Sequence, residues 1–112
     1  MHESHQVQHV ITHAQEMCAA RKIAAPKKIT ILVGELLGFD EMSVRLHWEE
    51  FAEGTILEKA ELVLQFVPAK LICPKCSAPF PKRGSDLSCP LCRVLGTPTA
   101  SGKEFQIADI TG

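Results

Sequence analysis

The first part of the chain places apolar residues at the spacing of an α-helix. At 100° per residue, six apolar side chains between residues 7 and 18 fall within about 120° of one another. They are Val7, Val10, Ile11, Ala14, Met17 and Cys18. This pattern predicts an amphipathic helix from about Ser4 to Arg21, and Pro26 excludes its continuation. Cys18 falls on the apolar face, where we expect it to pack as a small hydrophobic residue.

Three later segments favour β-strands. Apolar residues alternate with other residues over 28–35 and over 61–67, and residues 103–110 form a third candidate. Because successive side chains of a strand point to opposite faces, every second residue of 61–67 shares one face. We expect that face to carry Leu62, Leu64 and Phe66.

A second helix is expected between the first two strands. Asp40 fits the N-cap position, and the helix is predicted to reach about Ala52. Gly54 suits the C-terminal cap, because glycine adopts the left-handed conformation required there. The buried stripe of this helix is expected to be Val44, Trp48 and Phe51.

The composition changes after Pro68. Six of the seven prolines lie between residues 68 and 98, and so do four of the five cysteines. A segment of about 30 residues is too small for a hydrophobic core of its own, so a bound metal would supply the missing folding energy. We expect the third strand to return to the first sheet. The sequence therefore predicts an α+β fold, two helices packed on a three-stranded sheet, with an inserted zinc-ribbon-like module. Residues 1–68 and 100–112 would form a discontinuous domain, and residues 69–99 the zinc-binding domain.

Four cysteines form two Cys-x2-Cys pairs with 12 residues between them: Cys73, Cys76, Cys89 and Cys92. Both thiolates of such a pair can reach one ion, and two pairs complete a tetrahedral set that favours Zn(II), with iron as the minor alternative. The odd cysteine count and the lack of an evident secretory signal disfavour two disulfides, and the lack of a βαβ pattern disfavours a redox pair. Four thiolates leave no open position for water, so the predicted zinc is structural or sensory.

The chain begins Met1-His2-Glu3, which offers several nitrogen donors. The amine of Met1, the deprotonated amide nitrogen of His2 and the ring Nδ1 of His2 form adjoining chelate rings. Three nearly coplanar nitrogens suit a tetragonal or square-planar ion, Ni(II) or Cu(II). Glu3 or a nearby histidine such as His5 would give a further ligand. The alternative is a solvated terminus that binds no metal.

The other histidines have two interpretations each. His5, His9 and His13 share a polar face of the first helix, and at i, i+4 spacing two imidazoles can bind one ion. The competing interpretation is an exposed polar face that binds nothing. His47 lies on the second helix beside apolar positions, where we expect a partly buried imidazole satisfied by its neighbours.

Charge and hydropathy narrow the classes of function. Twelve basic and 13 acidic residues give a formal net charge of −1, which argues against a dedicated binder of nucleic acid or of an anionic membrane. No apolar run approaches the roughly 18 residues that span a bilayer, and no secretory signal is evident, so we expect a cytoplasmic location. A nucleic-acid-binding zinc ribbon is a weak alternative, because Lys70–Arg93 with four thiolates and Zn(II) carries only about +2 and one aromatic residue, Phe80. A zinc hydrolase is weaker still, since the metal has no open position.

Several segments together resemble one known family. They are the beginning Met1-His2-Glu3, residues 31–36, residues 51–55, Glu61-Leu62 leading into Pro68, and the two cysteine pairs. In this combination they are similar to the HypA/HybF family, nickel metallochaperones for the maturation of nickel-iron hydrogenases and, in some bacteria, of urease. The resemblance covers essentially the whole chain.

The resemblance implies a metal-delivery accessory protein rather than an enzyme. It implies that Met1 and His2 bind Ni(II), that Glu3 supports or completes that site, and that the four paired cysteines bind Zn(II). The expected partners are the nickel-handling GTPase HypB and the hydrogenase large subunit, with no nucleic acid and no membrane. The exposed edge of a three-stranded sheet is compatible with a monomer or a weak homodimer.

The chain departs from the family pattern at three places. Ser4-His5 follows Met1-His2-Glu3, where members commonly have an apolar residue and then serine. Ser77 and Arg93 stand where a glycine usually follows each cysteine pair, which predicts a looser turn without changing the number of ligands. No histidine flanks either pair, so we expect no exchange of cysteine for histidine at the zinc site.

Overall fold

The computed structural model describes residues 3–99 and 101–112. The chain divides into two compact units. The first, here called the helical unit, spans Met1–Leu32, Phe39–Gln65 and Phe105–Gly112. The second, here called the cysteine unit, spans Val33–Gly38 and Phe66–Glu104. No helix within the described residues is long and apolar enough to cross a membrane.

Helix α1 (Glu3–Ala20) has the apolar face that the sequence predicts. Its buried residues are Val7, Val10, Ile11, Ala14 and Cys18. The helix ends where Lys22 adopts a left-handed conformation with φ 58° and the Ile23 amide donates to the Cys18 carbonyl at 2.8 Å. Cys18 is fully buried, which confirms its expected place in the core.

Helix α2 (Glu41–Ala52) begins at the predicted N-cap. The Asp40 side chain accepts a hydrogen bond from the Ser43 amide at 3.0 Å, which satisfies one of the amides that a helix leaves free at its start. Gly54, with φ 79°, follows the helix in the left-handed conformation expected of it. The buried residues of α2 are Val44, Trp48 and Ala52. Phe51 is only half-buried, so its predicted place in the buried stripe is wrong.

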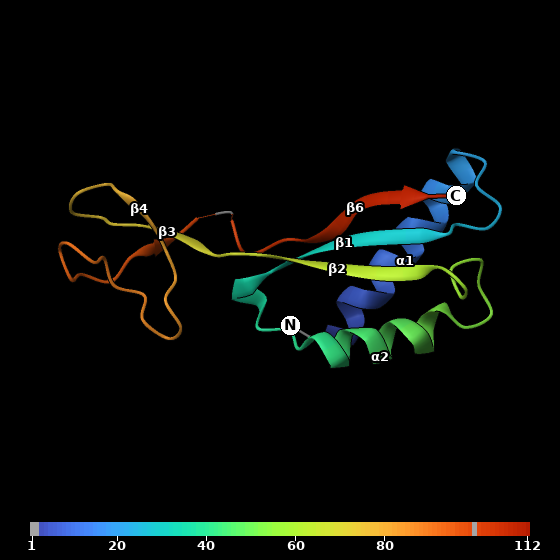
Figure 1. Cartoon of the computed structure of the whole chain (residues 1–112), viewed down its shortest axis with the longest axis horizontal. Coiled ribbons are helices and arrows are strands. Elements are labelled where there is room, and N and C mark those ends of the chain that lie inside the picture. The colour runs from blue at the N-terminus through green and yellow to red at the C-terminus, as the bar shows by residue number, and fades with distance from the viewer. Residues whose placement is uncertain (1–2, 100) are drawn as a thin grey trace. The chain divides into compact units, whose positions relative to one another are not determined.

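The helical unit is built on a sheet with strand order β2-β1-β6, seen in Figure 1 with α1 and α2. The strands are β1 (Lys28–Gly34), β2 (Glu61–Val67) and β6 (Phe105–Thr111). In β1, Ile29, Ile31 and Val33 are buried while Thr30 and Leu32 are half-buried, as the alternating pattern predicts. The last strand returns to the first sheet as expected, although it begins at residue 105 rather than 103.

Strand β2 covers the residues that the sequence predicts for the second strand. On the face expected to carry apolar residues, Leu62 and Leu64 are half-buried, whereas Phe66 is exposed. Phe66 is grouped with the cysteine unit rather than with the helical unit.

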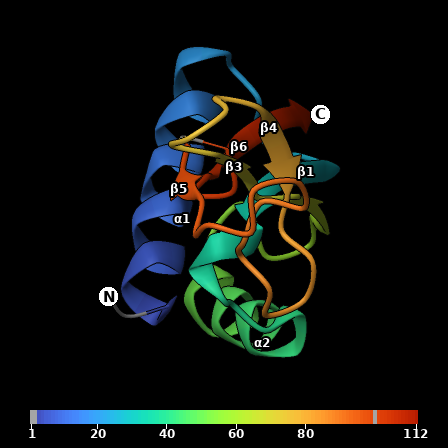
Figure 2. The same cartoon turned by 90° about the vertical axis from the view of Figure 1, so that its left-hand side faces the viewer.

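The cysteine unit contains a second, smaller sheet with strand order β4-β3-β5, visible in Figure 2. Strand β3 (Lys70–Ile72) pairs antiparallel with β4 (Pro79–Pro81) and with β5 (Thr97–Pro98). Its core consists of Leu71, Phe80, Cys73 and Cys89, with Leu87, Cys92 and Val94 packed against it. Two of the four buried residues are therefore cysteines.

A short 3-10 helix, η1 (Glu35–Leu37), is held within the cysteine unit by hydrogen bonds. The Glu35 carboxylate accepts from the Ala69 amide at 2.8 Å and lies 3.6 Å from the Lys82 ammonium. The Leu36 amide donates to the Gly102 carbonyl at 2.8 Å. These contacts fix residues 33–38 to the segment that leads into and out of the cysteine pairs.

Candidate metal centres

The four paired cysteines converge on one point in the cysteine unit. Their Sγ atoms all lie within 4.8 Å of one another, and those of Cys76 and Cys89 are 3.9 Å apart. A tetrahedral Zn(II) site with Zn–S bonds of about 2.3 Å has S···S edges of about 3.8 Å. The arrangement therefore fits a tetrathiolate centre with little change in the backbone. Since the four sulfur atoms form one group, the geometry favours a metal site over two separate disulfides.

Each cysteine pair forms the same tight turn. The Ser77 amide donates to the Cys73 carbonyl at 2.8 Å, and the Arg93 amide donates to the Cys89 carbonyl at the same distance. Ser77 and Arg93 have φ values of 63° and 59°, the left-handed conformation that usually favours glycine. The expectation that a missing glycine loosens these turns is therefore wrong. The turns keep their form, and the strain falls on these two residues instead.

Backbone amides in the turns point at the first sulfur atom of each pair. The amides of Lys75 and Cys76 each approach the Cys73 Sγ at 3.4 Å, and the Cys92 amide approaches the Cys89 Sγ at 3.5 Å. Such bonds stabilise a thiolate, because the donor hydrogen faces the negative sulfur. The hydrogen bond from the Cys76 amide is the main reason that the pKa of the Cys73 thiol falls from 9.0 to about 6, although burial opposes it.

The pKa of Cys92, the last cysteine of the set, shifts in the opposite direction. The side-chain hydrogen bond of Cys92 with Cys76, together with burial, raises the pKa of the Cys92 thiol from 9.0 to about 12. Four thiolates this close repel one another, so the full set can ionise only around a cation. The donor chemistry therefore suits a divalent metal. Within each pair the first cysteine is the less accessible one, since Cys73 and Cys89 are buried, Cys76 is exposed and Cys92 is half-buried.

The second candidate metal site is the start of α1, where the sequence predicts the nickel ligands. Met1 and His2 are outside the described residues. Glu3 begins α1, and its Oε1 atom is buried without a hydrogen-bond partner among the described residues. The imidazole of His47 on α2 lies beside this carboxylate, with Nε2 at 3.8 Å from Oε1. Within the helical unit, Glu3 is thus fixed at the helix start instead of extending into solvent.

His47 is half-buried beside Phe51, as the sequence predicts, and Glu3 is a neighbour that the sequence did not indicate. Its ring stacks on Phe51 with centroids 6.3 Å apart and planes inclined by 18°. Its only described charged neighbour is Glu3, 44 residues away in the chain, and no local pattern signals that approach. A buried carboxylate oxygen without a donor is costly, and a cation beside it removes that cost. His5, the other proposed nickel neighbour, is exposed on α1.

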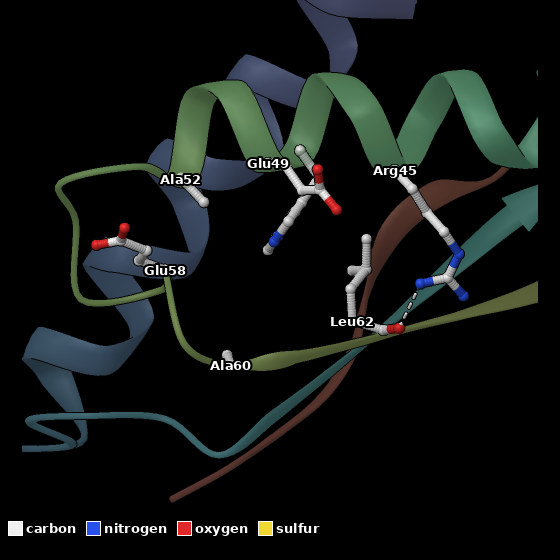
Figure 3. Close-up of a pocket in the computed structure, with 7 residues that line it drawn as sticks. Arg45, Glu49, Ala52, Glu58, Ala60 and Leu62 are labelled. Carbon is white, nitrogen blue, oxygen red and sulfur yellow. Dashed lines mark hydrogen bonds between the residues drawn. The ribbon is translucent and has the colours of Figure 1, made fainter.

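A hollow between α2 and the start of β2 has a volume of about 190 Å³ (Figure 3). Arg45 lines it and is already engaged, since its guanidinium donates to the Leu62 carbonyl at 2.9 Å and to the Glu41 carboxylate at 3.1 Å. The carboxylates of Glu49 and Glu58 also line it. Among the described residues, only the four cysteines bring three or more metal-ligating groups together, and none of these four lines this hollow.

The fold and the four-cysteine cluster define a metal-binding α+β protein. The family model described as "Hydrogenase/urease nickel incorporation, metallochaperone, hypA" matches residues 1–112, and the chain belongs to this HypA family. The family places the chain among nickel metallochaperones of hydrogenase and urease maturation.

Relatives and solved structures agree with this placement. The chain is 33% identical to the hydrogenase maturation factor HypA of Caldanaerobacter subterraneus subsp. tengcongensis, over 98% of this chain and 97% of the relative. It is 30% identical to the HypA of Geobacter metallireducens over the same shares of the two chains. The solution structure of the Ni metallochaperone HypA from Helicobacter pylori has the same fold, with a TM-score of 0.72 at 22% identity, covering 99% of this chain and 97% of that one.

Proposed function

We propose that this chain binds Ni(II) at its N-terminus and delivers it to the large subunit of a nickel-iron hydrogenase, or to urease, during maturation. The ligands are the Met1 amine, the amide nitrogen and ring Nδ1 of His2, and a fourth donor from Glu3, with His5 as a further candidate. The family description supports nickel as the cargo. The nitrogen-rich Met1-His2-Glu3 sequence supports the position.

The observation that carries this position is the Glu3 carboxylate. Its Oε1 atom is buried, lacks a described donor and lies 3.8 Å from the His47 imidazole. A cation bound by the two preceding residues would face this oxygen and relieve its unmet charge. Glu3 also starts α1, so the metal would sit at the first turn of a helix that is anchored in the core.

A delivery site has to bind nickel and also release it. Nitrogen and carboxylate ligands at the end of a chain can be replaced one at a time by those of a recipient, whereas a closed cage cannot. Protons compete with nickel for the His2 imidazole, so binding should weaken below about pH 6.5.

The cysteine centre has a different task in this proposal. Cys73, Cys76, Cys89 and Cys92 bind Zn(II) as a structural ion, with residues 69–99 as the zinc-binding domain inserted between residues 1–68 and 100–112. The matching sulfur geometry and the opposed pKa shifts of Cys73 and Cys92 support it. Zinc would supply folding energy, and a closed set of four thiolates gives it no open position for catalysis.

The family context supports the choice of partners. The chain belongs to the hydrogenase maturation machinery, and we propose the GTPase HypB as the protein that acts with it and the hydrogenase large subunit as its recipient. In this proposal the chain turns over no substrate, works in the cytoplasm as a monomer or weak homodimer, and binds neither nucleic acid nor membrane.

The proposal is tested by titrating Ni(II) into untagged, zinc-loaded protein and measuring heat. We expect binding of one Ni(II) in the micromolar range at pH 7.5, and loss of that binding in His2→Ala. An N-terminal peptide extension should have the same effect, because it converts the Met1 amine to an amide. The matched control is Gln8→Ala, an exposed change on the same helix. Unchanged nickel affinity in His2→Ala would overturn the proposal.

A second variant tests the part played by Glu3. Glu3→Gln removes the carboxylate charge and keeps the size of the side chain. If Glu3 contacts nickel, Glu3→Gln lowers the nickel affinity while the zinc content stays at one per chain. Equal affinities for wild type and Glu3→Gln would remove Glu3 from the site and leave Met1 and His2 in it.

A further inference from the structure

We propose that His9 and His13 form a second, weaker site for a divalent ion such as Ni(II) on the outer face of α1. This site is separate from the cysteine centre and from Met1-His2-Glu3, so it goes beyond the proposed function. It uses imidazoles that neither of those sites requires. The inference comes from three features of the helical unit: helical spacing, a shared hollow, and the contact of one imidazole with Glu16.

Helical spacing brings the two rings to one face. His9 and His13 are four residues apart in the regular helix α1, and residues at this spacing have Cβ atoms about 5–6 Å apart. Both are exposed, so binding a metal requires no burial of charge. Two imidazoles on adjacent turns of a helix are an established way to hold one divalent ion.

The two histidines also line one hollow in the structure. It has a volume of about 390 Å³ and is bounded on the other side by Phe105, Gln106 and Ile107 of β6. His5, which continues the same polar stripe by one turn, does not line it. The hollow therefore selects His9 and His13 from the three histidines, and this selection was not evident from the sequence. Gln106 is a polar residue among those that line the hollow.

The carboxylate of Glu16 lies near the His13 ring. The Glu16 Oε1 atom is 3.9 Å from the His13 Nδ1 atom, which is too far for a hydrogen bond. The carboxylate therefore leaves the ring nitrogens free and adds negative charge beside a cation bound there. The imidazole of His9 has no hydrogen bond or ion pair within residues 3–99 and 101–112, so its nitrogens are also available.

The number of ligands sets the strength of the site. Only the cysteines bring three or more ligating groups within 4.8 Å among the described residues, so two imidazoles bind the ion here and water completes its shell. Such a site exchanges its ion readily. It suits imidazole-favouring metals such as Ni(II), Cu(II) and Zn(II), and excludes Mg(II) and Ca(II), which prefer oxygen ligands.

The test uses full-length, zinc-loaded protein that carries His2→Ala, so that the N-terminal site is silent. Ni(II) is titrated while amide signals are followed by NMR, because this paramagnetic ion broadens signals near it. We expect broadening first at residues 9, 13 and 16 on α1 and at residues 105–107 on β6. His9→Gln and His13→Gln should each lower the apparent affinity on the order of tenfold or more.

A composition-matched variant tests the spacing itself. The double change His13→Gln with Gln15→His keeps the number of histidines but places the second one six residues from His9, about 120° away around the helix. The proposal predicts loss of the local broadening in this variant and its retention in the control Gln8→Ala. Persistence of the broadening in His9→Gln/His13→Gln, or in the displaced variant, would overturn the proposal. Either result is independent of whether His2→Ala abolishes the tighter nickel binding.

Discussion

The helical unit and the cysteine unit reach a folded state by different means. The helical unit buries large apolar side chains such as Ile29, Ile31, Trp48 and Ile110 between two helices and a sheet. The cysteine unit has a core cluster of four buried residues, of which only Leu71 and Phe80 are apolar side chains of substantial size. The other two, Cys73 and Cys89, belong to the candidate zinc set.

This difference suggests separate tasks for the two metals. A unit with few apolar side chains cannot offset the conformational entropy of about 1–2 kcal/mol per ordered residue, so it needs metal to fold. A unit with an apolar core needs no such ion and can carry a weaker site for a metal that must leave again. In this account zinc stabilises the cysteine unit, and nickel at the start of α1 is cargo.

The largest expected effect is the response to metal removal. Chelation of zinc, or Cys89→Ser, should broaden or collapse the amide signals of the cysteine unit, because four close thiols lose the ion that holds them together. Signals of the helical unit should persist. Two-dimensional NMR with metal analysis measures both. The matched control is Cys18→Ala, which removes the fifth cysteine from the helical core and should leave zinc at one per chain. Collapse of both units upon chelation would contradict this division.

A substitution in the core of the helical unit should destabilise that unit and leave zinc binding by the cysteine unit unaffected. Ile31 is 1% exposed, and Ile31→Ala should lower the free energy of unfolding by about 2–5 kcal/mol, while Ile31→Val costs about 0.5–1.5 kcal/mol. The single tryptophan, Trp48, lies in this unit, so its fluorescence during urea unfolding reports on it. Zinc content should stay unchanged. Loss of zinc from the folded Ile31→Val protein would show that the two units are not independent.

A smaller effect is expected when Gly96 of the cysteine unit, which lies close to Phe80 and Leu71, is given a side chain. A Cβ atom added at Gly96 would lie 2.4 Å from the Cζ atom of Phe80 and 2.9 Å from Leu71 Cβ. Gly96→Ala should therefore displace the Phe80 ring and destabilise the zinc-loaded unit by about 1–3 kcal/mol. A chelator that competes with the protein for zinc measures this loss of stability. The double variant Gly96→Ala/Phe80→Leu relieves the clash with the ring, although not the one with Leu71, and should recover part of the stability. No recovery would mean that the ring is not the obstacle.

The smallest expected effect is a gain in stability. Arg93 has a left-handed conformation with φ 59° in the turn after the second cysteine pair. Arg93→Gly should relieve this strain and make zinc harder to extract, by about 1 kcal/mol. Arg93→Ala is the control, because it removes the charged side chain and keeps the strain. Equal gains in the two variants would attribute the effect to charge instead of backbone conformation.

Regular patterns and close spacing made much of this molecule predictable. The helical period over residues 7–18 and the cap at Asp40 reproduce α1 and α2, and strand 61–67 agrees with β2. The four cysteines were evident from spacing alone, since two Cys-x2-Cys pairs have few other uses.

Features that depend on distant residues were not predictable. The approach of Glu3 to His47 joins two helices and has no local signal. The hydrogen bond from the Ala69 amide to Glu35, which fixes η1 in the cysteine unit, joins residues 34 apart. The left-handed conformation of Ser77 and Arg93 was hidden because neither residue type favours it. Glycine at these positions would have signalled the turns.

The most direct test of the account is X-ray absorption at the nickel and zinc edges of one untagged sample loaded with both metals. The account predicts nickel with nitrogen and oxygen neighbours only, and zinc with four sulfur atoms at about 2.3 Å. In His2→Ala the nickel spectrum should change, while the zinc spectrum stays the same. Sulfur neighbours around nickel, or a nickel spectrum that is indifferent to His2→Ala, would contradict the assignment of separate sites to cargo and structural metal.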